Sequence, residues 1–118
     1  MKYLALGQNN TANHLILIAT DEDGWLYDPL KVEIQIEDWS TGVSAQVYPA
    51  GAGAYADITT AGKHSKGIWR AYDLENTRGW RPTGNQGLHK LKWKYTSKTG
   101  ASTYEWSEDF QVAGSGLG

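Results

Sequence analysis

The sequence predicts an all-β fold, an antiparallel β-sandwich of seven or eight short strands and no helix. Three segments, residues 31–37, 88–95 and 104–112, alternate apolar with charged or polar positions. Successive side chains of a strand point to opposite faces, so each segment has one dry face and one solvated face. Clusters of Gly, Asp, Ser and Pro separate these segments, as expected for turns between short strands.

Turn sequences place the individual strands. Asp21-Glu-Asp-Gly24, Asp28-Pro29 and Ser40-Thr-Gly42 are turns, and residues 73–87 form a long polar loop. Residues 25–27 are a further short candidate. The eight predicted strands are residues 3–7, 12–20, 31–38, 43–48, 55–58, 68–72, 88–95 and 102–112.

The last two strands are expected to form a hairpin through residues 96–100. Its apolar side chains should meet on one face and opposite charges on the other. The predicted cross-strand pairs are Trp93 with Tyr104, Leu91 with Trp106, His89 with Glu108 and, on the other face, Lys92 with Glu105. The predicted core residues are Val32, Ile34, Ile36, Leu91, Trp93, Trp106 and Phe110.

Length and composition indicate one domain, residues 1–112, followed by a flexible tail at 113–118. The absence of Cys among 118 residues excludes a disulfide scaffold, a thiolate zinc site and a cysteine nucleophile. A net charge of −2 without a basic run argues against a nucleic-acid partner. The longest apolar stretch, residues 15–19, is too short to span a bilayer, and no signal peptide is expected.

Residues that carry chemistry are sparse. His14, His64 and His89 show no metal-ligand spacing, and no phosphate-binding loop is present. A His89–Glu108 pair has a catalytic interpretation and a structural one, and the structural one is favoured. The acidic turn 21–23 is interpreted as a solvated hairpin turn, with a bound cation as the alternative. We therefore predict no catalytic residue, no metal and no cofactor.

Six Trp and seven Tyr against one Phe suggest a protein rich in half-exposed aromatic side chains. Trp80 lies between Arg78 and Arg81 in the long loop, where an interface role is favoured over a lid on the sandwich. Trp25 and Trp39 stand in or beside turns, where they either close the ends of the core or remain exposed for binding. The predicted partner-binding residues are Arg78, Trp80, Arg81, Trp25 and Trp39.

The order of these signals resembles a known family. Asp23-Gly24 and Tyr27-Asp28-Pro29 precede a strand, and Gly67-Ile-Trp69 and Gly87-Leu-His precede two more. The chain closes on Glu108-Asp-Phe-Gln-Val112. Over residues 12–112 this pattern is similar to the small immunoglobulin-like structural proteins of tailed bacteriophages. The resemblance implies an immunoglobulin-like antiparallel β-sandwich of seven or eight strands that is not an enzyme, with no catalytic residues to carry over.

The function expected on this basis is structural. The protein would be a virion component, made in the host bacterial cytoplasm, such as a capsid decoration, neck, head–tail or tail protein. It would bind other virion proteins and form a homo-oligomer. The alternative is a carbohydrate-binding module that uses Trp25, Trp39 or Trp80 as a stacking platform for a glycan.

Overall fold

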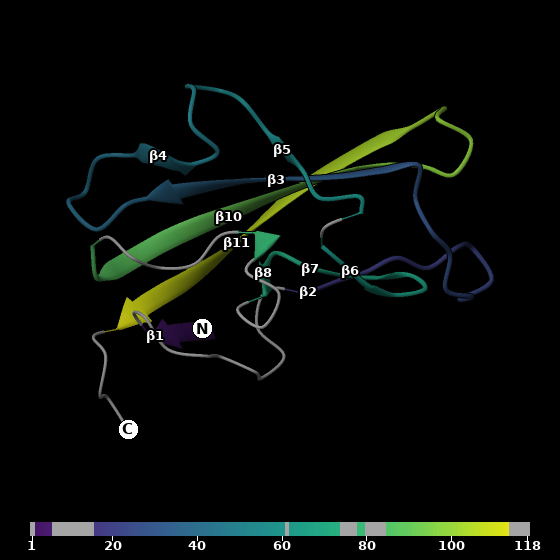
Figure 1. Ribbon diagram of the computed structural model, residues 1–118, viewed down its shortest axis with the longest axis horizontal. Helices are drawn as coiled ribbons and strands as arrows, with labels where there is room; N and C mark the ends of the chain where they lie inside the picture. The colour runs from purple at the N-terminus through teal and green to yellow at the C-terminus, as the bar shows by residue number, and fades with distance from the viewer. Residues whose placement is uncertain (1, 6–15, 61, 74–77, 80–84, 114–118) are drawn as a thin grey trace.

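The computed structural model describes residues 2–5, 16–60, 62–73, 78–79 and 85–113, and most of its strands belong to two sheets (Figure 1). The larger sheet has the order β1-β11-β10-β3-β4, with β5 also paired to β3. Its strands are β1 (Lys2–Ala5), β3 (Lys31–Asp38), β4 (Ala45–Tyr48), β5 (Ala56–Asp57), β10 (Gly87–Thr96) and β11 (Thr103–Ala113). Neighbouring strands are antiparallel, except that β1 runs parallel to β11, which the predicted antiparallel sandwich did not include.

The smaller sheet has three antiparallel strands, β2 (Ile16–Ile18), β7 (Ile68–Arg70) and β6 (Lys63–Ser65), in the order β2-β7-β6. A separate pair joins β8 (Tyr72–Asp73) to β9 (Arg78–Gly79). The described residues contain no helix, so the all-β prediction is confirmed. The predicted number of strands is too small, because eleven are described. The three additional strands, β6, β8 and β9, are only two or three residues long and lie in segments predicted as loops.

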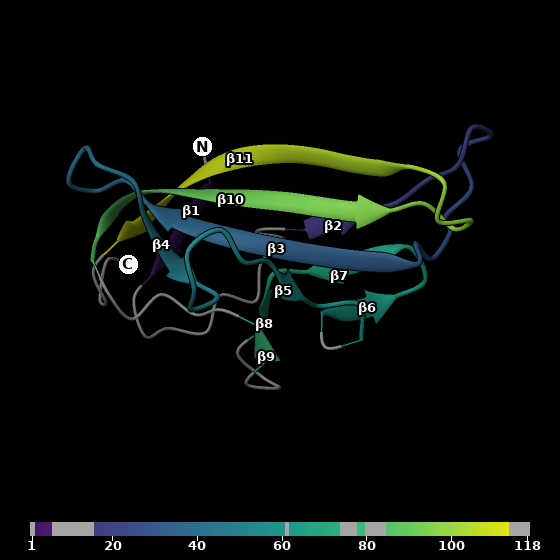
Figure 2. The same ribbon diagram turned by 90° about the horizontal axis from the view of Figure 1, so that it is seen from above.

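One buried core joins the two sheets. In Figure 2, β7 and β6 lie beneath the long strand β3. Leu17 of β2 and Trp69 of β7 belong to the same buried cluster as the inward side chains of β3, β10 and β11. The Trp69 indole Nε1 also donates a hydrogen bond to the Thr59 carbonyl oxygen at 3.0 Å. Six of the predicted core residues, Val32, Ile34, Ile36, Leu91, Trp93 and Phe110, are fully buried.

The β10–β11 hairpin has a register two residues away from the predicted one. Trp93 lies opposite Trp106, Tyr95 opposite Tyr104, Leu91 opposite Glu108 and His89 opposite Phe110. The turn causes the shift, because it closes between Ser97 and Ser102 and Gly100 adopts a φ of 78° within it. A shift of two residues leaves each side chain on its predicted face, because the strand period is also two. The predicted faces are therefore right although the predicted partners are wrong.

Trp106 contradicts the predicted core, because 36% of the residue remains exposed. It stacks on Trp93 with ring centroids 5.9 Å apart. In the described part of the chain, β11 pairs beyond β10 only at residues 110–113, where β1 lies. Trp106 lies outside that span, toward the hairpin turn, and it shields Trp93 from solvent at the rim of the core.

The outer face of the large sheet carries a network of ion pairs. Lys94 and Lys31 reach Glu33, Lys92 reaches Glu37 at 3.3 Å, and Lys90 reaches Asp109. The predicted pair of Lys92 with Glu105 is wrong, because the register sets Lys94 opposite Glu105. Such exposed pairs contribute about 0–1 kcal/mol each, and they keep this face polar.

The C-terminal boundary also differs from the prediction. Ala113 ends β11 and pairs with Ala5, so it belongs to the sheet and not to the predicted tail. Residues 114–118 lie outside the described residues.

Asp38, at the end of β3, predicts how stability depends on pH. Burial raises the pKa of this carboxyl, but hydrogen bonds from Ser40 and Asn85 and the nearby His89 outweigh burial and lower it below 3.8. A pKa lower in the folded than in the unfolded state adds stability above pH ~4, which is lost as pH falls through the folded value. Asp38→Asn should therefore cost about 1 kcal/mol at pH 7 and flatten the acid limb of the stability curve. Denaturation with urea between pH 2.5 and 7 tests this, and an acid limb as steep as the parent's would contradict it.

Candidate functional site

Exposed apolar side chains gather at one end of the molecule. Eight large apolar side chains in the described part of the chain are exposed, and six of them lie on residues 18–30 and 104–106. These six are Ile18, Trp25, Leu26, Leu30, Tyr104 and Trp106. The two segments adjoin, because the Leu30 N–H donates to the Thr96 carbonyl oxygen at 3.0 Å. We call residues 18–30 and 93–106 together the hairpin end; they lie on the right of Figure 1.

The acidic turn presents Trp25 to solvent. Asp21 Oδ1 accepts hydrogen bonds from the backbone N–H groups of Asp23 and Trp25, both at 2.9 Å. Gly24 follows with a φ of 83°, a conformation that glycine adopts without steric cost. Thr20 and Leu26 then form an isolated antiparallel bridge. This geometry matches the predicted hairpin turn, and it leaves Trp25 74% exposed at the tip.

A second turn holds this segment on the small sheet. The Ala19 N–H donates to the Gly67 carbonyl oxygen at 2.8 Å, and Asp28 accepts from the Gly67 N–H at 2.9 Å. Asp28 also binds Lys63 Nζ at 2.7 Å. The Lys63 and Gly67 hydrogen bonds lower the pKa of Asp28. The hairpin end therefore has a fixed attachment to the β6–β7 connection.

An aromatic row runs along β10 and β11. Tyr95 contacts Tyr104 with ring centroids 5.0 Å apart, and it meets Trp106 edge to face at 5.4 Å. Trp106 in turn stacks on buried Trp93. Pairs of this kind contribute about 0.5–1.5 kcal/mol beyond area burial. The row therefore connects the core to the exposed surface through packed rings.

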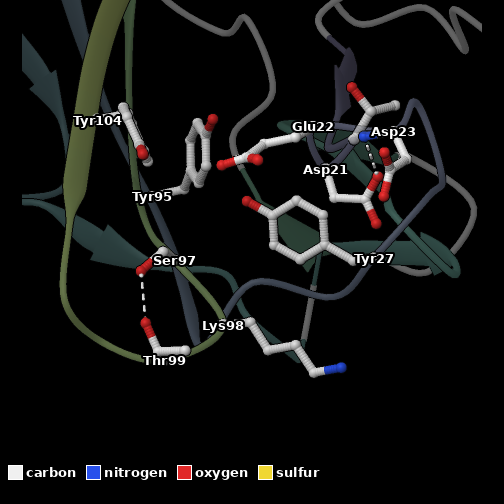
Figure 3. A pocket seen from close by; sticks show the side chains of 10 residues that line it. Asp21, Glu22, Asp23, Tyr27, Tyr95, Ser97, Lys98, Thr99 and Tyr104 are labelled. Atoms are coloured by element: carbon white, nitrogen blue, oxygen red, sulfur yellow. Dashed lines mark hydrogen bonds between the residues drawn. The ribbon is translucent and has the colours of Figure 1, made fainter.

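A cleft of about 460 Å³ lies between this row and the acidic turn (Figure 3). Residues 20–23 and Tyr27 form one wall, and Tyr95, Tyr104 and residues 97–99 form the other. Burial, followed by the neighbouring tyrosines Tyr95 and Tyr104, raises the pKa of the Tyr27 hydroxyl. In the view of Figure 3 the Glu22 carboxylate points toward Tyr27 and Tyr95. The cleft thus combines aromatic rings, hydroxyl groups and carboxylates. We call it the tyrosine cleft.

The predicted partner-binding residues do not form one site. Trp25 lies at the hairpin end, whereas Trp39 follows β3 at the opposite end, where its N–H donates to the Leu88 carbonyl oxygen. The Trp39 indole lies on the outer face, donates to Glu37 at 3.2 Å and lies under Lys90. Trp39 is therefore half-buried on its own sheet. Arg78 forms part of β9, opposite Asp73, so part of the predicted loop is a strand. Trp80 and Arg81 lie outside the described residues.

The histidines show no catalytic arrangement within the described residues. His89 is buried, with Nδ1 3.0 Å from the Gly87 carbonyl oxygen and its ring against Phe110. The predicted opposition of His89 to Glu108 is wrong by the register given above. His64 is exposed and lies 3.4 Å from Arg70, and His14 falls outside the described residues. No group of three or more His, Asp or Glu in the described part of the chain is arranged to hold a metal.

The sequence interpretation missed the tyrosines. Tyr27 was treated as a turn residue, and Tyr104 as a partner of Trp93. Once the hairpin register is known, the spacing of Tyr95 and Tyr104 places both on the inward face beyond the covered core. That register was the signal that could have found them. The described residues include no helix long and apolar enough to cross a membrane. Neither the protein-family models, the curated proteins nor the solved structures include a match to this chain.

Proposed function

We propose that this protein is a non-enzymatic structural component of a tailed-phage virion. It is an immunoglobulin-like β-sandwich that binds other copies or neighbouring capsid, neck or tail proteins. The observation that carries the binding role is the concentration of exposed apolar side chains at the hairpin end. The virion assignment rests on the sequence resemblance, and the sandwich assignment is supported by the core that the two sheets share.

The hairpin end suits a protein contact better than the rest of the described surface. Exposed Trp and Tyr side chains on an ordered frame are typical anchors of protein interfaces. Trp25, Tyr104 and Trp106 supply such anchors, and the fixed attachment of residues 19–28 limits the entropy lost on binding. The outer sheet face, in contrast, carries lysine–carboxylate pairs, which need no partner to be satisfied.

A substitution pair tests this proposal. Trp25→Ala and Tyr104→Ala, made together, should abolish incorporation into particles or self-association, because both side chains are exposed anchors. Their melting temperature should stay close to that of the parent, because neither residue belongs to the buried cluster. Incorporation is measured by quantitative mass spectrometry of purified particles, and self-association by analytical ultracentrifugation. Val43→Ala is the matched control, because Val43 is 71% exposed but lies outside the hairpin end.

Glycan binding is the second candidate, and the tyrosine cleft is the observation that favours it. Aromatic rings with nearby hydroxyl and carboxylate groups can bind sugar rings. The half-buried position of Trp39 removes one residue of the platform predicted from the sequence. Retention of the parent protein on immobilised glycans, lost in the Trp25→Ala, Tyr104→Ala double variant while particle incorporation stays normal, would replace the structural proposal with this one.

A further inference from the structure

The tyrosine cleft has a size and a lining suited to one side chain or small ligand. Its volume of about 460 Å³ lies within the range of ligand pockets, roughly 300–1,000 Å³. Tyr95 and Tyr104 stand on the long hairpin, whereas Glu22 and Tyr27 come from the segment attached to the small sheet. Parts of both sheets therefore position the two walls.

The charge of the cleft is negative. Three carboxylates, those of Asp21, Glu22 and Asp23, line it against a single ammonium group, that of Lys98. No ion pair joins these three carboxylates to a cation among the described residues. Asp21 is occupied in shaping the turn, which leaves Glu22 and Asp23 as the charges available to a ligand. The paired carboxylates of the outer face give a clear contrast.

The rings add to this negative potential. The face of an aromatic ring attracts a cation that lies within about 6 Å of its centroid. The chain uses this contact three times within itself, with Lys63 over Trp69, Lys90 over Trp39 and Lys94 over Tyr55. In the tyrosine cleft, Tyr27, Tyr95 and Tyr104 meet beside the acidic turn, and no cation–ring contact is recorded for them in the described structure.

We propose that the tyrosine cleft binds the cationic end of a lysine or arginine side chain, held by the three tyrosine rings and the Glu22 and Asp23 carboxylates. The proposal deepens the structural role and rests on it only for the source of the cation, a neighbouring protein at the hairpin end. A cation matches this lining better than a sugar does. A sugar hydroxyl both donates and accepts hydrogen bonds, whereas the carboxylates here only accept.

Titration of the isotopically labelled full chain with three capped tripeptides tests the proposal. The probes are acetyl-Gly-Lys-Gly-amide, acetyl-Gly-Arg-Gly-amide and the neutral acetyl-Gly-Gln-Gly-amide, followed by NMR at up to millimolar concentration. The cationic probes should shift the resonances of Glu22, Tyr27, Tyr95 and Tyr104, and the neutral probe should not. Added salt should weaken binding, because the carboxylates are exposed.

Variants separate the cleft from a general acidic surface. Glu22→Gln with Asp23→Asn should weaken binding of the cationic probes about tenfold, because it removes both available charges. Tyr95→Leu should weaken binding without changing the dependence on salt. Glu105→Gln should leave binding unchanged, because Glu105 lines a different cleft beside Tyr55 and Lys92. Both acidic variants are in exposed turns or strands and should melt with the parent.

Three results would overturn the inference: no shifts with either cationic probe, equal shifts with the glutamine probe, or shifts at the cleft produced by cellotetraose and not by the cations. Failure of the virion proposal would look different. Cation binding at the cleft would persist, while the protein would be absent from purified particles.

Discussion

Trp93→Ala is expected to destabilise the fold by about 3–5 kcal/mol, as a large-to-small change at a fully buried position. Trp93 lies between Leu91 and Tyr95 on β10, opposite Ile34 on one side and Trp106 on the other. Removing the indole leaves a cavity at the centre of the large sheet. At roughly 4 °C per kcal/mol for a domain of this size, the melting temperature should fall by about 12–20 °C. Thermal unfolding followed by tryptophan fluorescence measures the change.

Two further variants sharpen this prediction. Trp106→Ala should cost clearly less, about 1–2 kcal/mol, because Trp106 is partly exposed and contributes mainly ring stacking. Trp93→Phe should fall between the parent and Trp93→Ala. The Trp93 Nε1 is buried without a hydrogen-bond partner among the described residues, so phenylalanine removes an unsatisfied donor that costs about 1–3 kcal/mol. Equal losses for Trp93→Ala and Trp106→Ala would show that the core is assigned to the wrong residues.

Gly67→Ala is expected to destabilise the protein by roughly 2–5 kcal/mol and to loosen the hairpin end. Gly67 has a φ of 75°, which costs an alanine about 1–2 kcal/mol. An added Cβ would also lie 2.9 Å from the Leu26 Cβ and 3.1 Å from the Ala19 carbonyl oxygen, so overpacking adds about 1–3 kcal/mol. The same substitution disturbs the hydrogen bonds that tie residues 19 and 28 to this turn. Urea denaturation measures the stability, and hydrogen exchange at residues 19–28 measures the local loosening.

Gly53→Ala is the matched control for this second substitution. Gly53 has a similar φ of 79°, but nothing lies within 4 Å of an added Cβ. The control should therefore show only the backbone cost, about 1–2 kcal/mol, with unchanged exchange at residues 19–28. If both substitutions cost the same, then Gly67 is required only for its backbone conformation, and the proposed packing against Leu26 is wrong.

The strand faces were predictable from sequence because alternation depends only on local geometry. Val32, Ile34 and Ile36 lie on the buried face of β3, as the period-two pattern indicates. Partners across the sheet depend on the turn, and the position of Gly100 moved the register by two residues. Burial along β11 depends in addition on which strands cover it, which no local pattern specifies. Trp106 was placed in the core for that reason.

The candidate site was only partly predictable for the same reason. The acidic turn and the exposure of Trp25 follow from short-range signals, Asp21 and Gly24 above all. The tyrosine cleft joins Tyr27 to Tyr95 and Tyr104, residues about seventy positions apart, so it requires the tertiary arrangement. Gln46 is a similar case. Its amide orders the Gly- and Ala-rich loop through contacts with Pro49, Gly51, Gly53 and Ala54, an arrangement that composition alone did not indicate.

Site-specific photocrosslinking from the hairpin end tests the central claim most directly. A photoreactive phenylalanine at position 106 is compared with one at position 43, since Trp106 and Val43 are both exposed apolar residues but lie on different segments. In cells that produce particles, position 106 should crosslink to a second copy or to a virion protein identified by mass spectrometry, and position 43 should not. Absence of crosslinks from position 106 in assembled particles, or equal crosslinking from both positions, would contradict an assembly role for this surface.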